Sequence, residues 1–283
     1  MCENGFSVSL CVYNGDNAEQ FDAAINSIIS QTLSPKEVVV TVDGPIKSTI
    51  EEVIGKYIEE LSSSSIGFKI IRLEKNRGHG EARRICFESC SYPLIAIMDA
   101  DDLSEQQRFE KQIHYFSKHP EVSVVGGFIT DFISASNPLD ISRSAGKRIV
   151  PENDKEIKQF MKKRCPMNQV TVMFKKDDVA AVGGYIDWYC EEDYYLWIRL
   201  ALAGKKFANI PENLVNVRVG EEMYQRRGGW KYFKSEAKLQ KYMLSKGMIN
   251  IFRFFINISE RFALQVVVPN HLRGYIFRVL ARQ

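Results

Sequence analysis

Short apolar runs alternate with segments of helical periodicity through the first hundred residues. The apolar runs are rich in β-branched and aromatic residues and end at turn-forming residues, which is the pattern of buried strands. We predict strands at 6–13, 37–42, 68–73 and 94–98, and helices at 21–29, 48–61 and 82–89. Such alternation predicts a mostly parallel sheet with helices on both faces, in which ligands bind at the carboxyl ends of the strands.

The alternation loosens in the second part of the chain. The pattern there predicts helices at 105–117, 154–164 and 194–203 and strands at 122–132 and 170–174. A polar stretch at 134–148 and a glycine turn at 182–185 separate these elements. The fold class expected from the whole pattern is α/β.

Three carboxylates crowd the end of the apolar run 94–98, in the sequence Asp99-Ala100-Asp101-Asp102. Like charges at the end of a buried strand are costly unless a cation lies among them, and hard oxygen ligands favour Mg²⁺ or Mn²⁺. A second interpretation is that Asp102 or Ser104 caps a helix beginning near Glu105, with Gln107 completing a capping box. Capping accounts for one acid and not for three.

Composition places this chain of 283 residues, 45% hydrophobic and 26% charged, among globular proteins rather than disordered ones. Six cysteines include no Cys-x-x-Cys pair, so we expect reduced thiols and a cytoplasmic protein. We also expect neither a signal peptide nor a membrane-spanning run. The net charge of +3 is uneven: residues 225–283 hold 12 Lys and Arg against 2 Asp and Glu, which leaves the preceding part negative. Because that part would repel nucleic acid, we expect no nucleic-acid partner.

Several short motifs follow one another along the chain. They are Val12-Tyr13-Asn14, Asp43-Gly44, Asn76-Arg77-Gly78, Asp99-Ala100-Asp101-Asp102, Gly183-Gly184-Tyr185 and Glu192-Asp193. In this order they resemble a family 2 glycosyltransferase with the GT-A fold, over roughly residues 6–230. The resemblance implies a Rossmann-like, mostly parallel sheet flanked by helices. It also implies transfer of a sugar from a nucleotide-sugar to an acceptor hydroxyl with inversion, assisted by Mn²⁺ or Mg²⁺.

The resemblance also assigns a domain organisation. Residues 1–230 would form the catalytic domain, with a nucleotide-binding half at 1–103 and an acceptor-side half at 104–230. Residues 231–283 would form a basic, amphipathic helical extension.

On the donor side, the resemblance implies that Asp101 is the metal ligand. Asp99 would support the ribose or the metal shell, with Ala100 between the two acids at the donor. Asp43 would accept hydrogen bonds from the base or ribose, and Tyr13 would pack on the base. The alternatives are that Asp43 is a turn residue and that Tyr13 fills the core.

Arginines are the candidate ligands for the diphosphate, because a guanidinium matches phosphate oxygens. They are Arg83 and the pair Arg226-Arg227, which lies in a glycine-rich stretch that could close as a lid. For the pair, a solvated basic loop is the alternative. Processive members of the family carry Gln-x-x-Arg-Trp, and Gln225-Arg226-Arg227-Gly228-Gly229-Trp230 departs from that spacing, which favours addition of a single sugar.

Inverting transfer needs a base on the acceptor side, because the attacking hydroxyl must lose its proton. Glu192 and Asp193 are the candidates, and the resemblance favours Asp193. The rival interpretation is that Glu191, Glu192 and Asp193 only interact favourably with a helix N-terminus. His79, between two glycines, is expected to be a solvated loop residue; the alternative is that it approaches the sugar or the phosphates.

The basic tail beyond residue 230 is rich in Phe and Ile but too polar to span a bilayer. Such segments are typical of helices that lie on an anionic membrane surface, here the inner face of the plasma membrane. A helix pair that packs on the catalytic domain or on a second subunit is the alternative. Relatives in bacterial surface polysaccharide assembly (O-antigen, capsule or exopolysaccharide) use lipid-linked acceptors, and a UDP-sugar is the expected donor.

Two other classes of function compete with a transferase. An Asp-x-Asp phosphatase or phosphotransferase would use the first Asp as nucleophile, but such enzymes usually begin with the motif, which here follows three strands. A non-catalytic module that binds a nucleotide-sugar is the third hypothesis. Retention of both Asp101 and Asp193 argues against it.

Overall fold

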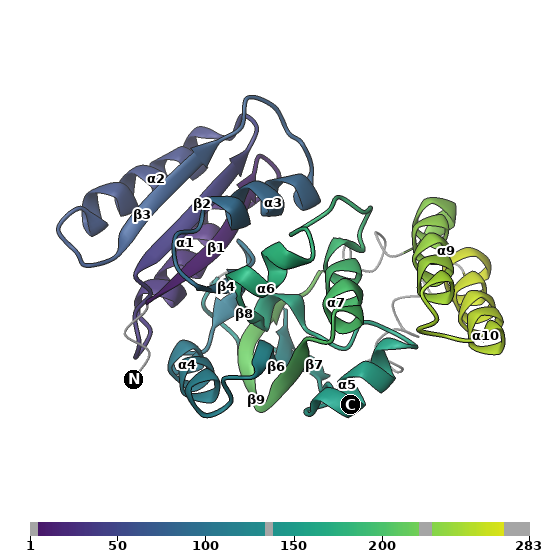
Figure 1. Ribbon diagram of the computed structural model, residues 1–283. Helices are drawn as coiled ribbons and strands as arrows, with labels where there is room; N and C mark the ends of the chain where they lie inside the picture. The colour runs from purple at the N-terminus through teal and green to yellow at the C-terminus, as the bar shows by residue number, and fades with distance from the viewer. Residues whose placement is uncertain (1–4, 134–137, 221–227, 269–283) are drawn as a thin grey trace.

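A computed structural model describes residues 5–133, 138–220 and 228–268 of the chain (Figure 1). Within these residues, one sheet of nine strands has the order β3-β2-β1-β4-β8-β6-β9-β5, and β7 pairs with β6. Strands β1, β2, β3, β4, β6 and β9 run in one direction, and β5, β7 and β8 run against them. The predicted α/β class with a mostly parallel sheet is confirmed.

The first half of the chain forms the parallel part of the sheet as predicted. Its elements are β1 Phe6–Tyr13, α1 Ala18–Ile29, β2 Glu37–Asp43, α2 Ser48–Leu61, β3 Gly67–Arg72, α3 His79–Ser89 and β4 Leu94–Met98. Helix α3 begins three residues earlier than predicted, so His79 is its first residue and not a loop residue.

Strand alternation divides the core between the two faces of the sheet. Val8, Leu10 and Val12 of β1 join the helices α1 and α2 in one cluster. On β4, Ile95 and Ile97 point to the other face, where α3 and α7 cover them. Burial on both faces explains why these strands read as continuous apolar runs rather than as alternating ones.

The second half departs from the prediction at several places. Its elements are β5 Leu103–Ser104, α4 Arg108–Lys118, β6 Val122–Phe132, β7 Ser144–Arg148, α5 Asp154–Met161, a 3₁₀ turn Gln169–Thr171, β8 Met173–Lys175, α6 Lys176–Ala181, α7 Glu192–Leu202 and β9 Lys206–Arg218. The long strand β9, β7 within the polar stretch, and α6 were not predicted. The predicted strand 170–174 is correct only in its last part, because the 3₁₀ turn occupies its start.

The tail forms two helices beside each other, α9 Gly229–Ser245 and α10 Ile251–Phe262, followed by a π-helical turn, Ala263–Val267. Figure 1 shows the pair at one end of the molecule, beyond α7 and away from the parallel strands. Hydrogen bonds join it to the body: Asn257 Nδ2 donates to the carbonyl of Lys162 at 2.8 Å and the Trp188 indole donates to that of Ser235 at 3.3 Å. The alternative that the tail forms a helix pair packed on the rest of the protein is thus confirmed. In the described part of the chain, no helix is long and apolar enough to cross a membrane.

Candidate active site

The carboxyl ends of β1, β2 and β4 bring three predicted site residues to one edge of the sheet. Tyr13 and Asp43 are direct partners in the β1–β2 register, and Asp99 follows the last residue of β4, the strand on the other side of β1. Tyr13 is 45% exposed, so the alternative that it fills the core is wrong. Its backbone N–H donates to Asp16 Oδ2 at 2.9 Å, which holds the turn after β1.

Asp43 fixes the loop that leads into α3. Its carboxylate is buried and accepts hydrogen bonds from the backbone N–H groups of Arg77, at 2.6 Å, and Gly78, at 3.0 Å. The loop passes so close to Gly44, whose φ is +86°, that a Cβ there would lie 2.5 Å from the nitrogen of Asn76. Asp43 is therefore more than a local turn residue, because it ties the end of β2 to a segment more than thirty residues away.

The acid turn, residues 99–102, is held by Arg218 at the end of β9. The backbone N–H of Arg218 donates to Asp102 Oδ1 at 2.8 Å, and its Nε donates to the carbonyl of Asp101 at 2.9 Å. Burial of Asp102, together with the charges of Asp101 and Asp99, raises the pKa of Asp102 well above its ordinary value. The buried carboxylate of Asp102 thus holds the acid turn to the end of β9.

The capping interpretation of Asp102 and Ser104 is wrong. Helix α4 begins at Arg108, and Ser104 lies in β5, which pairs with β9. Pairing with β9 keeps these residues extended, so the helix cannot begin near Glu105. The side chain of Glu105 instead accepts a hydrogen bond from Asn216 of β9 at 2.7 Å.

Negative charge is concentrated around the acid turn. Burial, reinforced by the charges of Asp101 and Asp99, raises the pKa of Asp16 to about 6. Behind the turn, Arg108 is fully buried and donates to the carbonyl of Ile97 at 2.7 Å, and burial lowers its pKa to about 9. The carboxylates repel one another even with this arginine nearby. A divalent cation fits such a donor set because it would relieve the repulsion.

The protein itself nevertheless offers few side chains that could coordinate a metal ion. Among the described residues, no group of three His, Cys, Asp or Glu side chains is close enough to hold a metal ion. Asp99, one of the two predicted ligands, already pairs with Arg83. A metal at Asp101 would therefore need oxygen ligands from a donor diphosphate or from water, as Mg²⁺ and Mn²⁺ sites commonly do.

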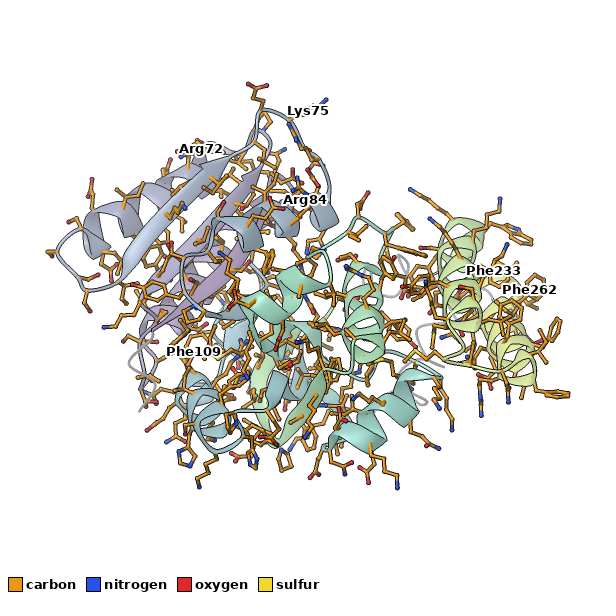
Figure 2. The ribbon with its side chains drawn as sticks, viewed as in Figure 1. Arg72, Lys75, Arg84, Phe109, Phe233 and Phe262 are labelled. Carbon is orange, nitrogen blue, oxygen red and sulfur yellow. The ribbon has the colours of Figure 1, made fainter. Side chains whose placement is uncertain are left out.

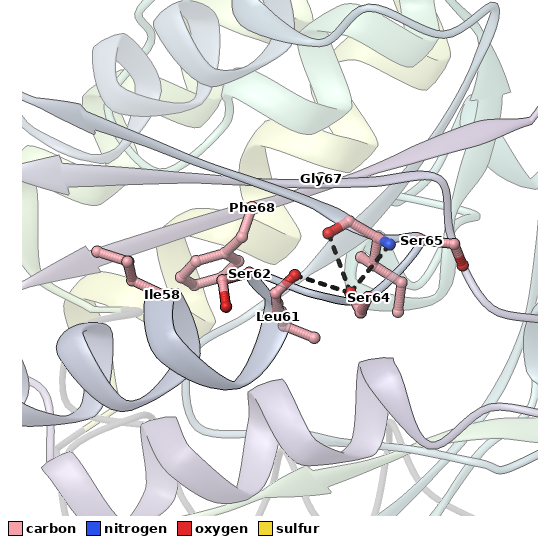
Figure 3. A pocket seen from close by; sticks show the side chains of 8 residues that line it. Ile58, Leu61, Ser62, Ser64, Ser65, Gly67 and Phe68 are labelled. Carbon is pink, nitrogen blue, oxygen red and sulfur yellow. Dashed lines mark hydrogen bonds between the residues drawn. The ribbon is translucent and has the colours of Figure 1, made fainter.

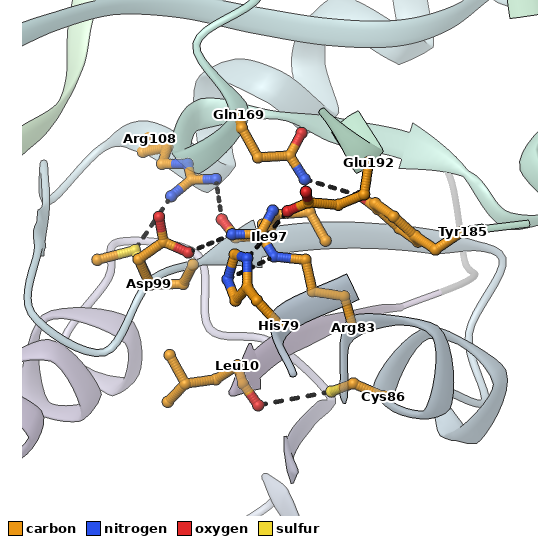
Figure 4. A network of polar contacts seen from close by, with 11 residues as sticks. Leu10, His79, Arg83, Cys86, Ile97, Asp99, Arg108, Gln169, Tyr185 and Glu192 are labelled. Atoms are coloured by element: carbon orange, nitrogen blue, oxygen red, sulfur yellow. Dashed lines mark hydrogen bonds and ion pairs between the residues drawn. The ribbon is translucent and has the colours of Figure 1, made fainter. Parts of the chain in front are cut away.

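A chain of polar contacts connects the acid turn to the start of α7 (Figure 4). Arg83 Nη2 donates to Asp99 Oδ1 at 2.6 Å, and Arg83 Nε donates to His79 Nε2 at 3.0 Å. His79 Nδ1 lies 2.9 Å from Glu192 Oε1. Because Nε2 accepts, Nδ1 of a neutral ring carries the proton and donates it to Glu192. The expectation of a loop residue is wrong, because His79 begins α3. Its side chain is 57% exposed, as expected for a solvated residue, yet its ring is an intermediate link in this chain.

The three acids before and within α7 have different surroundings. Burial opposes ionisation of Glu192, but the hydrogen bond from His79 and the nearby charge of Arg83 outweigh it and lower the pKa of Glu192. Glu191 is buried, and burial and the charge of Glu236 raise its pKa. Asp193 is partly exposed, and its Oδ1 accepts the N–H of Tyr194 at 2.6 Å.

Both Glu192 and Asp193 lie in the first turn of α7, where a carboxylate interacts favourably with the helix dipole. That interaction does not explain the contact of Glu192 with His79 of α3. The residue before Glu191, Cys190, has a φ of +57°, an uncommon conformation for a residue with a Cβ. This conformation turns the backbone just before Glu191, where the chain enters α7.

Two predicted site residues cannot be placed, and three residues of the candidate site were not predicted from the sequence. Arg226 and Arg227 lie outside the described residues. Sequence reasoning did not assign Asp16, Arg108 or Arg218 to the site. For Arg218, the β-branched run Leu214-Val215-Asn216-Val217 before it could have indicated a strand ending at the site.

A separate pocket lies at the turn between α2 and β3 (Figure 3). It is lined by Ile58, Leu61, Ser62, Ser64, Ser65, Ile66, Gly67 and Phe68. Gly67 begins β3, so the pocket lies at the amino ends of the parallel strands, opposite the edge that carries the acids. It plays no part in the candidate site.

Comparison with known proteins places the chain within a family. The model described as "Glycosyl transferase family 2" matches residues 7–207. The amylovoran biosynthesis glycosyltransferase AmsE of Erwinia amylovora is 34% identical over 240 residues, 85% of this chain and 86% of that protein. A UDP-Gal:α-D-GlcNAc-diphosphoundecaprenol β-1,3-galactosyltransferase of Escherichia coli is 32% identical over 278 residues, 98% of this chain and 97% of that protein.

Solved structures show the same fold. A mannosyltransferase of Pyrobaculum calidifontis, solved in complex with GDP-Man and Mn²⁺, superposes with a TM-score of 0.63 at 13% identity. The match covers 99% of this chain and 76% of that one. At this identity the likeness concerns the fold alone.

Proposed function

This chain belongs to glycosyl transferase family 2 and is a glycosyltransferase, and from this premise we propose that it transfers a single sugar from a UDP-sugar to a lipid-linked saccharide, with inversion. The relative that uses UDP-Gal and a diphosphoundecaprenol acceptor, similar over nearly the whole chain, supports the donor and acceptor classes. The amylovoran enzyme supports a role in bacterial surface polysaccharide assembly. Family membership favours this function over the phosphatase and the binding module.

The observation that carries the proposal is the connection between two acidic sites. The acid turn after β4 and the acids that begin α7 are joined through Arg83 and His79. Transfer with inversion requires a leaving group on one side of the sugar and a base on the other. The polar chain would hold these two places in fixed positions relative to each other. We retain the division into a nucleotide-binding half (1–103), an acceptor-side half (104–230) and an extension (231–283).

On the donor side, Asp101, with Asp99 beside it, would hold Mn²⁺ or Mg²⁺. When bound, this metal neutralises the charge that develops on the departing diphosphate. The exposed ring of Tyr13 offers a face for the base. Asp43 positions the loop 76–78 and is the candidate acceptor of a hydrogen bond from the base or ribose. Arg83 orients Asp99 and would offer positive charge to the diphosphate.

On the acceptor side, we assign Asp193 as the base. Glu192 is buried and held by His79, and its lowered pKa makes it a poor proton acceptor. Asp193 is the more accessible of the two carboxylates. Its Oδ2 would take the proton of the acceptor hydroxyl as that oxygen attacks the anomeric carbon, while the bond to the diphosphate breaks.

Ligand-dependent thermal stability tests the donor and metal assignments together. A panel of nucleotide-sugars is screened with Mn²⁺ or Mg²⁺, and a UDP-sugar is expected to raise the melting temperature of the wild type through linkage. Asp101→Ala should lose the metal-dependent part of that shift. Equal shifts in both proteins would refute the metal assignment, and a response confined to another nucleotide would refute the UDP donor.

Product analysis with the donor so identified tests the reaction itself. A synthetic diphospholipid-linked sugar is the acceptor, and the expected product carries one added sugar with inverted anomeric configuration. Addition of several sugars, or retention of configuration, would contradict the proposal.

A further inference from the structure

Helix α10 is oriented with its polar side inward. Three polar residues spaced four apart, Asn257, Arg261 and Gln265, are 0%, 7% and 4% exposed along α10 and the π-helical turn that follows. On the other side of α10 lie apolar side chains with large exposed fractions. They are Ile251 at 47%, Phe252 at 76%, Phe255 at 60%, Ile256 at 47% and Phe262 at 39%. A helix at the surface of a globular protein normally shows the reverse arrangement.

The inward side of α10 is held by specific polar contacts. Asn257 Nδ2 donates to Gln240 Oε1 at 2.7 Å and to the carbonyl of Lys162. The Arg261 guanidinium pairs with Glu236 at 3.2 Å and donates to the carbonyl of Lys163 at 2.8 Å. These partners come from α9 and from the segment after α5. Rotating α10 to bury its phenylalanines would expose these groups and break every one of these bonds, so the outward apolar face is a fixed feature of the fold.

Aromatic side chains extend this apolar face onto the start of α9. Figure 2 shows Phe233 and Phe262 close together on the two helices, and their ring centroids lie 5.6 Å apart. Trp230, which is 57% exposed, packs against both rings at 5.7 and 5.9 Å. The face therefore combines an exposed Trp with several Phe and Ile side chains, a composition typical of helices that enter the headgroup region of a bilayer.

Positive charge lies beside the apolar face on α9 and continues in the sequence of the tail. Lys234 and Lys241 are exposed, and helical spacing places them on the same side of α9 as Trp230. Glu260 is the only acid in the sequence of α10. The 15 residues that follow Val268 add three arginines, Arg273, Arg278 and Arg282, and no acid. Cations beside an apolar face favour a surface of anionic lipid headgroups.

We propose that the outward face of α10, with Trp230 and Phe233 of α9, docks on an anionic lipid surface with α10 lying in the plane of the interface. A second copy of this chain fits the face less well, because pairing of two identical tails would bring two strongly positive segments together. A lipid surface supplies both the apolar layer and the negative charge. The membrane-surface expectation and the packing expectation for the tail then describe the two opposite sides of one helix pair.

Vesicle co-sedimentation of the full-length protein tests the proposal without donor, metal or acceptor, so its failure would leave the proposed transfer untouched. The wild type is expected to pellet with vesicles of phosphatidylglycerol and phosphatidylcholine and much less with phosphatidylcholine alone. Phe252→Ser combined with Phe255→Ser should weaken the partition at least about tenfold. Both phenylalanines are exposed, so the variant should keep the melting temperature of the wild type.

The matched control replaces two exposed apolar residues elsewhere, Ile58 of α2 and Ile149 after β7. They are 48% and 52% exposed. Ile58→Ser with Ile149→Ser should pellet like the wild type. A wild type that stays in the supernatant with anionic vesicles overturns the proposal, as does equal pelleting of all three proteins. Absence of vesicle binding together with a wild-type dimer that Phe252→Ser and Phe255→Ser dissociate would assign the face to a second copy instead.

Discussion

Two ion pairs with shielded arginines lie in different regions of the molecule and differ in how open they are. Arg83 and Asp99, at the strand ends, have side chains that are 5% and 34% exposed. Arg261 and Glu236, between α10 and α9, are 9% and 12% exposed. The first pair leaves its carboxylate partly open beside other acids, where a ligand could share it. The second pair is closed, and it holds a helix with its polar side inward. Burial of charge therefore belongs to the candidate active site in one region and sets the orientation of a helix in the other.

The largest expected difference between the two regions concerns turnover. Asp193→Asn should lower kcat by about 10³-fold, because an amide cannot take the hydroxyl proton, while donor binding stays unchanged. The matched substitution in the tail, Glu236→Gln, should leave kcat within a factor of about three. Steady-state kinetics with calorimetric donor binding measures both. Full turnover by Asp193→Asn would remove it as the base.

The free energy of unfolding should fall most when the closed pair, Arg261 and Glu236, is broken. Arg261→Met leaves the charge of Glu236 buried without its cation and should cost about 3 kcal/mol of unfolding free energy. Arg253→Met, on the same helix, should change it by less than about 0.5 kcal/mol. Urea unfolding of both variants measures these two changes in unfolding free energy. Equal, small losses would mean that the pair does not hold α10 in place.

The smallest expected effect is the change in unfolding free energy when Glu192 is replaced, and this change should depend on pH. Because the folded protein holds its pKa below the ordinary value of 4.5, ionised Glu192 stabilises the fold above that pH, and the contribution is lost as the pH falls through the lowered pKa. Glu192→Gln should therefore cost about 1 kcal/mol at pH 7, a small value because His79 is exposed to solvent, and this cost should shrink as the pH falls through the lowered pKa. Unfolding free energies measured from pH 7 into the acid range test this. A constant difference would contradict the hydrogen bond between His79 and Glu192.

Local pattern predicted the first half of the fold well because its strands are buried on both faces and its helices carry regular apolar stripes. Strand β2 and helix α2 appear almost at their predicted bounds. Strand β9 was not predicted because polar residues, such as Asn209 and Asn216, interrupt its apolar pattern. These asparagines are buried, and their hydrogen-bond partners, such as Pro151 and Glu105, are distant in sequence.

For the site, the sequence placed Tyr13, Asp43 and Asp99 correctly at one edge, because the ends of parallel strands must meet there. It could not show that Arg83 pairs with Asp99, or that His79 links Arg83 to Glu192. Glu192 is 113 residues from His79, and no local periodicity carries that information. The contribution of Arg218 was missed because β9, the strand that ends at it, was not predicted, although the short apolar run before Arg218 offered a local signal.

The sequence alone determined the α/β class, the positions of the first four strands, the acid turn and the family to which its motifs point, because each of these depends on residues that are close along the chain. Tertiary structure decided which acids are shielded and which are accessible, and it decided which side of α10 faces outward. A helical pattern defines an apolar side and a polar side but not their direction. Here the buried contacts of Asn257 and Arg261 with α9 and the segment after α5 set that direction.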